Sequence, residues 1–336
     1  MGRFGLTLLA GAANLVALLL LSVVYGSTSI PVTDSIQAVS LGLGLSAGET
    51  EPVHRIIFDL RLPRALFATV IGAGLGIVGV VLQSTTRNDL ADPFLFGLSS
   101  GAAAGAVFVI TVTGDVLGIW TLPLAAFCGG MVASAIVLGL VSGLHTSAPE
   151  KLILAGLAVS FLFAAITNYL IFSGDSRAAH SVVFWMLGGL GLARWESFPL
   201  VCAGLTVIAV YTLYRRRWLD ALLTGDMTAG TLGVPVKRLR FTMFFVAALA
   251  TAVFVSVSGV IGFVGLMVPH IARGLVGPLH SHLVPMAALV GAALLTGSDI
   301  LARVLLAPQE LPVGIVTTSI GSLFVFALLF RQRARR

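Results

Sequence analysis

Long apolar segments separated by short polar stretches recur along the whole chain. Most of them hold about 20 residues, the length of helix that crosses the hydrocarbon core of a bilayer. The pattern predicts ten such helices, of which the eighth is short and is expected to continue, tilted or re-entrant, through Pro269. The ten predicted spans are Phe4–Tyr25, Pro63–Leu82, Pro93–Val112, Leu117–Leu140, Lys151–Phe172, Ser197–Tyr214, Phe241–Val257, Val260–Val268, Leu283–Leu305 and Val313–Phe330.

The composition agrees with this pattern. Of 336 residues, 57% are hydrophobic and only 10% are charged, and the mean hydropathy is +1.04. A soluble domain carries about 25% charged residues, so a lipid bilayer is the expected surroundings. We predict an all-α polytopic membrane protein with about ten transmembrane helices and a single domain, residues 1–336. Cys128 and Cys202 lack metal-binding spacing and are expected within the apolar spans.

The distribution of lysine and arginine predicts the orientation. Ten spans place both termini on one side, and a cytoplasmic placement puts 14 of these residues inside and six outside. Cytoplasmic loops of membrane proteins carry such an excess, so we expect both termini in the cytoplasm. The net charge of +6 is then a topology signal and predicts no nucleic-acid partner. The six outer residues are Arg55, Arg61, Arg64, Arg177, Arg194 and Arg303.

The largest polar feature on the expected cytoplasmic side runs from Arg215 to Arg240. Basic clusters at both ends flank a stretch of small and acidic residues that includes Asp220 and Asp226. We predict that a partner docks between the clusters. The flanking arginines are expected to act mostly as anchors at the membrane surface.

Catalytic signatures are missing from the predicted loops. No G-x-x-x-x-G-K-[ST] phosphate loop and no H-E-x-x-H zinc motif occur, and we expect no serine nucleophile elbow. His280 and His282 are expected as a solvated pair rather than a metal site. Ion-driven carriers place ionisable residues near the membrane centre, whereas Asp299 and Arg303 lie at one end of the ninth span, where they are predicted to pair. We therefore expect no metal site, and an energy source on another polypeptide.

Local signals predict helix starts and helix packing. Asp92 and Pro93 suit the N-cap and the first position of a helix. Ser147–Glu150 has the spacing of a capping box, and it is either a plain helix start or a gate at the inner mouth. The GxxxG pairs Gly72–Gly76 and Gly101–Gly105 predict close helix packing within the bundle, with a dimer contact as the alternative.

Four motifs occur in order along the chain. They are RLPR at Arg61–Arg64, LQSTTRNDLADPFLFGLSSGAAAG at Leu82–Gly105, GVIGFVGLMVPHIARGLVG at Gly259–Gly277 and DILARVLLAPQELPVG at Asp299–Gly314. Together they resemble the FecCD-type permeases of bacterial ABC importers for ferric siderophores, haem and cobalamin. The resemblance covers essentially the entire chain.

This resemblance implies a cobalamin-importer-type permease fold and a homodimer in the bacterial inner membrane. It also implies two cytoplasmic ABC ATPase subunits, which bind ATP and magnesium, and a periplasmic substrate-binding protein. This chain itself would be a permease without enzymatic activity, and it would bind no cofactor. Transport in the family is inward along the dimer axis, and the fifth and tenth helices line much of the pathway.

The resemblance also implies roles for residues. The family's coupling helices match the segment from Leu219 to Pro235, and the implied coupling residues are Leu219, Asp220, Gly225, Asp226, Ala229, Gly233 and Pro235. Three further positions, Arg61, Arg64 and Arg303, match outer arginines that meet carboxylates of the binding protein. Exposed guanidinium groups suit bidentate capture of carboxylates. Snorkelling to lipid headgroups is the alternative.

We expect small and hydroxyl-bearing side chains along the translocation pathway. Ser160 and Thr167 lie seven residues apart and therefore on one helix face. The candidate pathway and gate residues are Ser147, Glu150, Ser160, Thr167 and Asn168.

The chain departs from the family pattern at two positions of one cytoplasmic turn. Asp89 stands where proline is common, and Ser84 stands where glycine is often found. The expected cargo is an iron chelate, first a ferric siderophore, with haem and cobalamin as alternatives. A stand-alone secondary carrier is the alternative from another class. It requires activity without an ATPase, and the missing mid-membrane carboxylates count against it.

Overall fold

The computed structural model describes residues 2–28, 30–42, 52–142 and 149–334, which form helices, turns and loops and no strand. The α-helices are α1 Arg3–Val24, α2 Val32–Gly42, α3 Pro52–Arg55, α4 Leu62–Thr86, α5 Leu98–Phe108, α6 Thr121–Ser142, α7 Pro149–Ser173, α8 Ser176–Met186, α9 Phe198–Leu222, α10 Asp226–Thr231, α11 Val236–Ser258, α12 Val264–Val276, α13 His280–Val304 and α14 Val313–Ala334. Turns of π-helix at Ile56–Arg61 and Val109–Thr113 adjoin α4 and α5, and 3-10 turns lie at Pro93–Phe96, Gly118–Trp120 and Trp195–Ser197.

The ten predicted spans all correspond to helices. Within the described residues, eight helices are long and apolar enough to cross a membrane, and two shorter apolar helices, Leu98–Thr113 and Val264–Val276, complete the set. The predicted start of the eighth span at Val260 is wrong. Gly259 and Phe263 have φ of 64° and 66°, a left-handed conformation that interrupts a helix, so α12 begins only at Val264.

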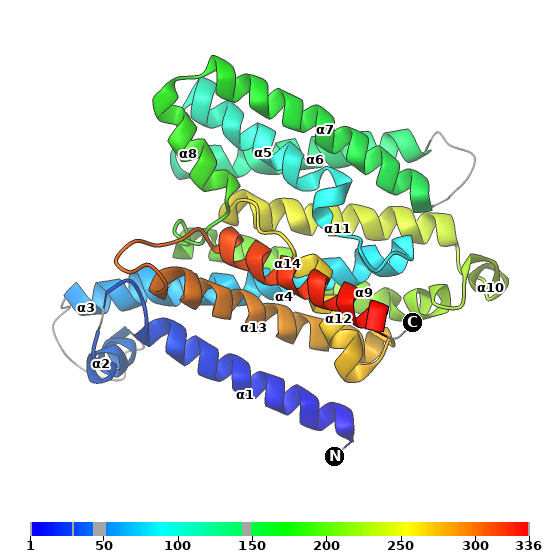
Figure 1. Ribbon diagram of the computed structural model, residues 1–336, viewed down its shortest axis with the longest axis horizontal. Helices are drawn as coiled ribbons and strands as arrows, with labels where there is room; N and C mark the ends of the chain where they lie inside the picture. The colour runs from blue at the N-terminus through cyan, green and yellow to red at the C-terminus, as the bar shows by residue number, and fades with distance from the viewer. Residues whose placement is uncertain (1, 29, 43–51, 143–148, 335–336) are drawn as a thin grey trace.

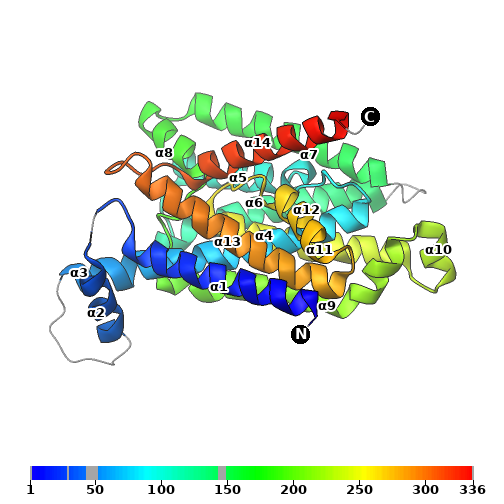
Figure 2. The ribbon, with the colours of Figure 1, turned by 60° about the horizontal axis from the view of Figure 1, so that its bottom comes forward.

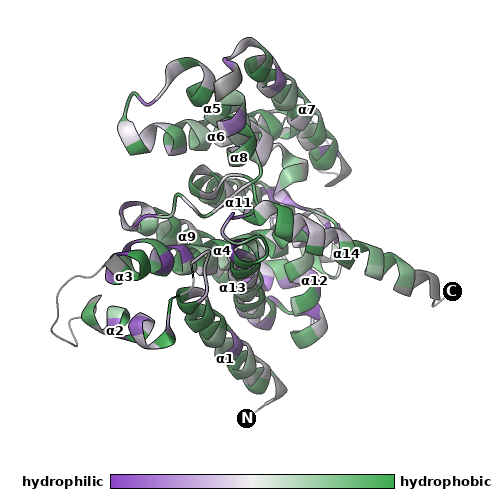
Figure 3. Ribbon diagram, turned by 60° about the vertical axis from the view of Figure 1, so that its left-hand side comes forward, coloured by the Kyte–Doolittle hydropathy of each residue, from purple (hydrophilic) through white to green (hydrophobic). Residues whose placement is uncertain are grey.

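Long helices run between two ends of the molecule (Figure 1). One end carries α10 and the turn at residues 87–92, and we name it the α10 end. The other carries Arg61, Arg64 and Arg303, and we name it the arginine end. Both α1 and α14 have their chain-terminal ends towards the α10 end, where α10 projects from the bundle (Figure 2). The long helices consist mostly of hydrophobic residues (Figure 3), as expected for helices that cross a lipid bilayer.

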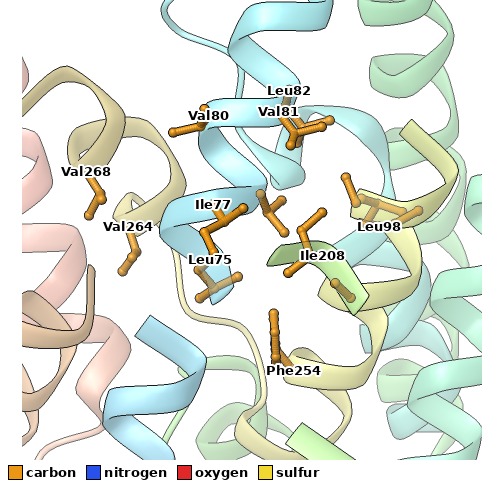
Figure 4. Packing of buried hydrophobic residues seen from close by; sticks show 14 of the residues in the cluster. Leu75, Ile77, Val80, Val81, Leu82, Leu98, Ile208, Phe254, Val264 and Val268 are labelled. Carbon is orange, nitrogen blue, oxygen red and sulfur yellow. The ribbon is translucent and has the colours of Figure 1, made fainter. Parts of the chain in front are cut away.

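Helix α4 lies at the centre of the bundle. In the helical segment that contains it, 83% of the most apolar stretch is buried, whereas only 6% of the corresponding stretch of α1 is buried. It packs against α9, α11, α12 and α13. Figure 4 shows Leu75 and Ile77 of α4 beside Phe254 of α11 and Ile208 of α9. Displacing α4 would therefore disturb four helices at once.

Glycines bring α4 and α13 into backbone contact. A methyl group on Gly72 would lie 2.3 Å from the carbonyl oxygen of Gly291, and one on Gly76 would lie 2.6 Å from that of Ala287. Gly101 approaches Gly129 of α6 in the same way. In lipid, such close approach is a main source of helix–helix attraction. The prediction that these GxxxG pairs pack within the bundle is confirmed.

A buried carboxylate organises the arginine end. Asp299 is fully buried, its Oδ1 lies 2.8 Å from Arg64 Nε, and its Oδ2 lies 3.0 Å from Arg303 Nε. The predicted pairing of Asp299 with Arg303 is thus confirmed. Arg64 also reaches Glu310 Oε2 at 2.6 Å, so one carboxylate joins α4 to α13 and a second ties in the loop before α14.

The same arginines hold the end of α1. Arg303 Nη1 donates to the carbonyls of Ser22 at 3.0 Å and Tyr25 at 2.9 Å. Arg61 Nη1 donates to the carbonyl of Val24 at 2.6 Å. The last carbonyls of a helix have no partner within it, and here arginine side chains from distant segments supply the donors.

The turn between α4 and α5 is shaped by polar side chains. Arg87 ends α4 in a left-handed conformation with φ of 52°, and Asn88 Oδ1 accepts from Leu90 N at 2.9 Å. Asp92 Oδ1 accepts from Phe94 N at 3.0 Å, which confirms the predicted N-cap, although the capped element is a 3-10 turn. Burial raises the pKa of Asp92 from 3.8 to about 6, and the hydrogen bond from Phe94 only partly opposes this.

The buried carboxylate at the arginine end gives the first prediction. Asp299→Ala should destabilise the protein by about 3–5 kcal/mol, because it leaves two largely buried guanidinium groups without their shared partner. Glu310→Gln is the matched control, since its carboxylate is half exposed and its ion pair should contribute about 1 kcal/mol or less. The measurement is the thermal unfolding midpoint in detergent. Equal shifts for the two variants would contradict this account.

Asp92 gives a pH-dependent prediction. Its folded-state pKa lies above its unfolded value, so its contribution to stability is full below pH 4 and is lost as the pH rises through about 6. Asp92→Asn keeps the accepting oxygen and removes the charge. The variant should be more stable than the unmodified protein at pH 7.5, by at most about 3 kcal/mol, and equally stable near pH 4. Exposed Asp115→Asn should change neither midpoint, and a pH-independent effect of Asp92→Asn would refute the assignment.

Candidate functional site

The projecting surface at the α10 end is built on two sharp turns. Gly225 and Gly233 have φ of 106° and 81°, conformations that glycine adopts without strain, and they bracket the six-residue helix α10. Between them Ala229 is fully buried and fixes α10 to the bundle. The opposite side of α10 is apolar and open, with Met227 86% exposed and Leu232 66% exposed. We call Leu223, Met227 and Leu232 the α10 surface.

An ion pair beneath α10 holds this surface in place. Arg240 donates from both terminal nitrogens to Asp226, at 2.7 Å and 2.8 Å, and from Nε to the carbonyl of Thr85 at 2.8 Å. Only 8% of Arg240 is exposed. The prediction that the flanking arginines are mostly membrane anchors is therefore wrong for Arg240, because it binds inside the protein. The guanidinium carbon of Arg215 lies over the ring of Trp218, 4.1 Å from the ring centre.

Asp220 and His280 form a second buried contact. Asp220 lies in the last turn of α9 rather than in a loop, and its Oδ1 accepts from the backbone N and from Nδ1 of His280, at 2.9 Å and 2.7 Å. The other ring nitrogen, Nε2, is 2.8 Å from Ser84 Oγ. His280 is fully buried, so the expectation of a solvated pair with His282 is wrong.

The predicted coupling residues thus fall into two groups. Asp220, Asp226 and the fully buried Leu219 and Ala229 form a frame that contacts the bundle. Gly233 and Pro235 are exposed beside the α10 surface, while Gly225 is half-buried. Sequence reasoning missed the most exposed members, Met227 and Leu232, although exposed apolar side chains in a polar loop are a typical signal of an interface.

A cavity of about 640 Å³ opens where α14, the end of α8 and the turn after α4 meet. Among the described residues of its wall, Asp92 is the one ionisable side chain, and the others are apolar apart from two hydroxyl groups. The wall is formed by Leu90, Asp92, Phe94, Met186, Leu187, Val260, Gly262, Phe263, Leu266, Gly314, Ile315, Thr318 and Ser319. The start of α14 therefore lines this cavity, and a pathway role for the tenth predicted helix stays a prediction.

The predicted pathway residues on α7 have varied surroundings. Ser160 is half-buried, and its Oγ donates to the carbonyls of Gly156 at 2.9 Å and of Phe94 at 3.3 Å. Thr167 is buried with its hydroxyl on its own helix, and Asn168 is exposed. Ser147 and the side chain of Glu150 lie outside the described residues. A pathway role for all five stays a prediction.

The three predicted docking arginines are not exposed as expected. Arg61 and Arg303 are 6% and 2% exposed, and Arg64 is largely buried between two carboxylates. That expectation is wrong, because the end of α1 and the carboxylates of Asp299 and Glu310 already take up their donors. Docking of a binding protein at these residues stays a prediction.

Two chemical features complete the site. The described residues hold no group of three or more His, Cys, Asp or Glu side chains arranged for a metal ion. Contrary to expectation, the G-x-S-x-G spacing does occur, at Gly97–Gly101. Its Ser99 is 2% exposed inside α5, and the Oγ has no hydrogen-bond partner among the described residues. A serine without a base and without access is not a nucleophile.

Relatives with established names resemble this chain over most of its length. The Hemin transport system permease protein of Yersinia pestis is 36% identical over 289 residues, covering 85% of this chain and 86% of the relative. The Fe(3+) dicitrate transport system permease protein of Escherichia coli is 37% identical, covering 83% and 86%. The Cobalamin import system permease protein of Halobacterium salinarum is 38% identical, covering 95% and 88%.

A solved structure shares the fold. It comes from a protein described as a metal-chelate type ABC transporter in an inward-facing conformation, with a TM-score of 0.83, 31% identity, and coverage of 97% of this chain and 99% of that chain. The FecCD transport family matches residues 14–331. A match of this extent, together with relatives above 30% identity, shows that the chain belongs to the FecCD transport family.

Proposed function

We propose that this protein is the membrane-spanning subunit of an ATP-driven importer for a metal chelate, first a ferric siderophore, with haem or cobalamin as alternatives. Two copies would form the pathway. Two cytoplasmic ATPase subunits would bind ATP and magnesium, and a periplasmic binding protein would deliver the cargo. The family membership supports this assignment, and the relatives named above are permeases for hemin, ferric dicitrate and cobalamin.

The α10 surface is the observation that carries the proposal. Met227 and Leu232 would be costly to leave in water without a partner, and the two buried contacts of Asp220 and Asp226 hold them on a rigid base. A rigid apolar projection between polar turns suits insertion into a cleft of a soluble partner. The ATPase would supply that cleft.

The charge distribution supports a cytoplasmic position for the α10 end. Lys237, Arg238, Arg216 and Arg217 are exposed there, and cytoplasmic loops carry such an excess of positive charge. The arginine end would then face the periplasm, and both termini would lie in the cytoplasm of a bacterial cell.

The cavity supports passage of a large, already wrapped cargo. Its volume of about 640 Å³ and its largely apolar wall offer space with few strong binding groups. A weak site suits transport, because cargo that binds tightly inside the pathway leaves slowly. Uptake of ferric siderophores, haem and cobalamin, each measured with the assembled transporter, would show which of them is the cargo.

Charge introduced on the α10 surface tests the proposal. Met227→Asp together with Leu232→Asp should abolish co-purification of the ATPase subunits and ATP-dependent uptake, because two carboxylates would have to be buried in the cleft. Lys237→Ala with Arg238→Ala is the control, and it should retain more than half of the associated ATPase. Association that survives the aspartates, or gradient-driven uptake by this chain alone, would refute the proposed function.

A further inference from the structure

Three consecutive residues at the α10 end of α4 each bind a different part of the bundle. Gln83, Ser84 and Thr85 are 2%, 8% and 2% exposed. Their partners lie on α12, on α13 and on α11, between 155 and 196 residues away in sequence. These contacts join the frame of the α10 surface to the wall of the cavity.

The first route runs through His280. Asp220 Oδ1 binds both the backbone N and the Nδ1 of this residue, so Nδ1 carries a proton and donates it to the carboxylate. In the neutral ring Nε2 is then an acceptor, and Ser84 Oγ donates to it at 2.8 Å. The hydrogen-bonded chain Asp220–His280–Ser84 links the end of α9 to α4 and fixes the start of α13.

A second route runs through Arg240. Its guanidinium group binds Asp226 of α10 with two nitrogens and the carbonyl of Thr85 with the third. Both acidic residues of the α10 frame are thus joined, each by one basic side chain, to neighbouring positions of α4. A displacement of α10 must move Arg240 and Thr85 or break these hydrogen bonds, and a displacement of the end of α9 acts on Ser84 in the same way.

Gln83 of α4 contacts α12 where Pro269 interrupts the hydrogen bonds of that helix. Pro269 lies inside α12 and has no N–H, so the carbonyl of Gly265 loses its partner within the helix. Gln83 Nε2 donates to this carbonyl at 3.3 Å and to the carbonyl of Leu266 at 3.1 Å. Arg273 of α12 donates to Gln83 Oε1 and pairs with Asp89 at 3.2 Å.

The turn that follows α4 forms part of the cavity wall. Leu90, Asp92 and Phe94 line the cavity, and the carbonyl of Phe94 accepts from Ser160 on α7. Only four residues lie between Thr85 and Leu90, and contacts of Asn88 and Asp89 hold the turn that they form. A short, internally bonded turn transmits a displacement instead of absorbing it.

We propose that Ser84, Thr85, His280 and Arg240 are positioning residues that carry movement of the α10 surface to the cavity wall at Leu90–Phe94. This inference rests on the proposed function, because it takes the ATPase subunits as the source of movement. It assigns a role to Ser84, one of the two positions at which the chain departs from the family pattern. The hydroxyl group that distinguishes serine from glycine makes the contact to His280.

The test measures the accessibility of a residue in the cavity wall and does not require that the cargo be known. Leu90→Cys, in a background with Cys128→Ala and Cys202→Ala, places one thiol on a wall residue that is 56% exposed. The probe is a charged, membrane-impermeant maleimide, applied to the transporter assembled with its ATPase subunits in detergent. The labelling rate is compared between the nucleotide-free state and the state trapped with ATP and vanadate, and we expect at least a fivefold difference.

Two variants then interrupt the His280 route. Ser84→Ala and Ser84→Gly should each reduce the ratio of the two labelling rates to below twofold, because both remove the hydroxyl group that contacts His280. In Ser84→Ala the rate of ATP hydrolysis should stay within twofold of the unmodified complex, which shows that the subunits still assemble and turn over. Ser84→Gly places the residue that is often found at this position in the family, so it keeps the test valid if the alanine variant does not fold.

Thr69→Val is the matched control. Thr69 Oγ1 and Thr296 Oγ1 form a 3.3 Å hydrogen bond between the same two helices, α4 and α13, towards the arginine end, and its loss should leave the ratio unchanged. If both interrupting variants keep the at least fivefold difference between the two labelling rates, the inference is overturned and the proposed function stands. If nucleotide has no effect on labelling in the parent protein while the ATPase subunits remain bound and hydrolyse ATP, the inference also fails and the proposed function stands. If no ATPase subunits associate with the parent protein, the proposed function fails and the inference fails with it.

Discussion

Buried polar groups at the α10 end of α4 must find their partners within the protein, because neither lipid nor packed side chains can replace water. Gln83, Ser84 and the carbonyl of Thr85 meet this constraint by binding α12, α13 and α11. In the middle of α4, Gly72 and Gly76 bring this helix against α13. The central helix is thereby fixed to every element that supports α10, and the position of the α10 surface follows from it.

The two ends of the bundle use the same principle differently. At the arginine end, a buried carboxylate between two arginines closes the network on itself, and the remaining donors fix the end of α1. That arrangement suits a rigid end. At the α10 end, the ion pair of Asp226 and Arg240 starts from an exposed helix, and Arg240 also binds the carbonyl of Thr85, from which the chain continues to the cavity wall at Leu90. Asp299 belongs to a buried part of α13, whereas Asp226 belongs to the exposed helix α10. For this reason we place the moving part of the protein at the α10 end.

Helix positions were predictable from apolar length alone, because each span must match the bilayer. The start of α12 was not, since no sequence pattern requires Phe263 to adopt a positive φ. The sequence singled out Arg61, Arg64 and Arg303 but did not reveal that they are buried. Their partners are distant in sequence: Arg303, for example, binds Ser22, which lies 281 residues earlier. The sequence did place Pro269 in the continuation of the eighth span, and it did mark Ser84 as a departure from the family pattern. Neither signal could name a partner without the fold.

The central claim is that the α10 surface and the turn at Leu90 move as one body. Spin labels on exposed Thr228 of α10 and on Leu90, in one labelled copy beside an unlabelled one, measure their separation directly by pulsed electron resonance. The account predicts the same distance distribution in the nucleotide-free and the ATP–vanadate-trapped transporter, while the distance between the Thr228 positions of two labelled copies changes. A change of separation within one copy, with α10 moving and the turn left behind, would contradict it.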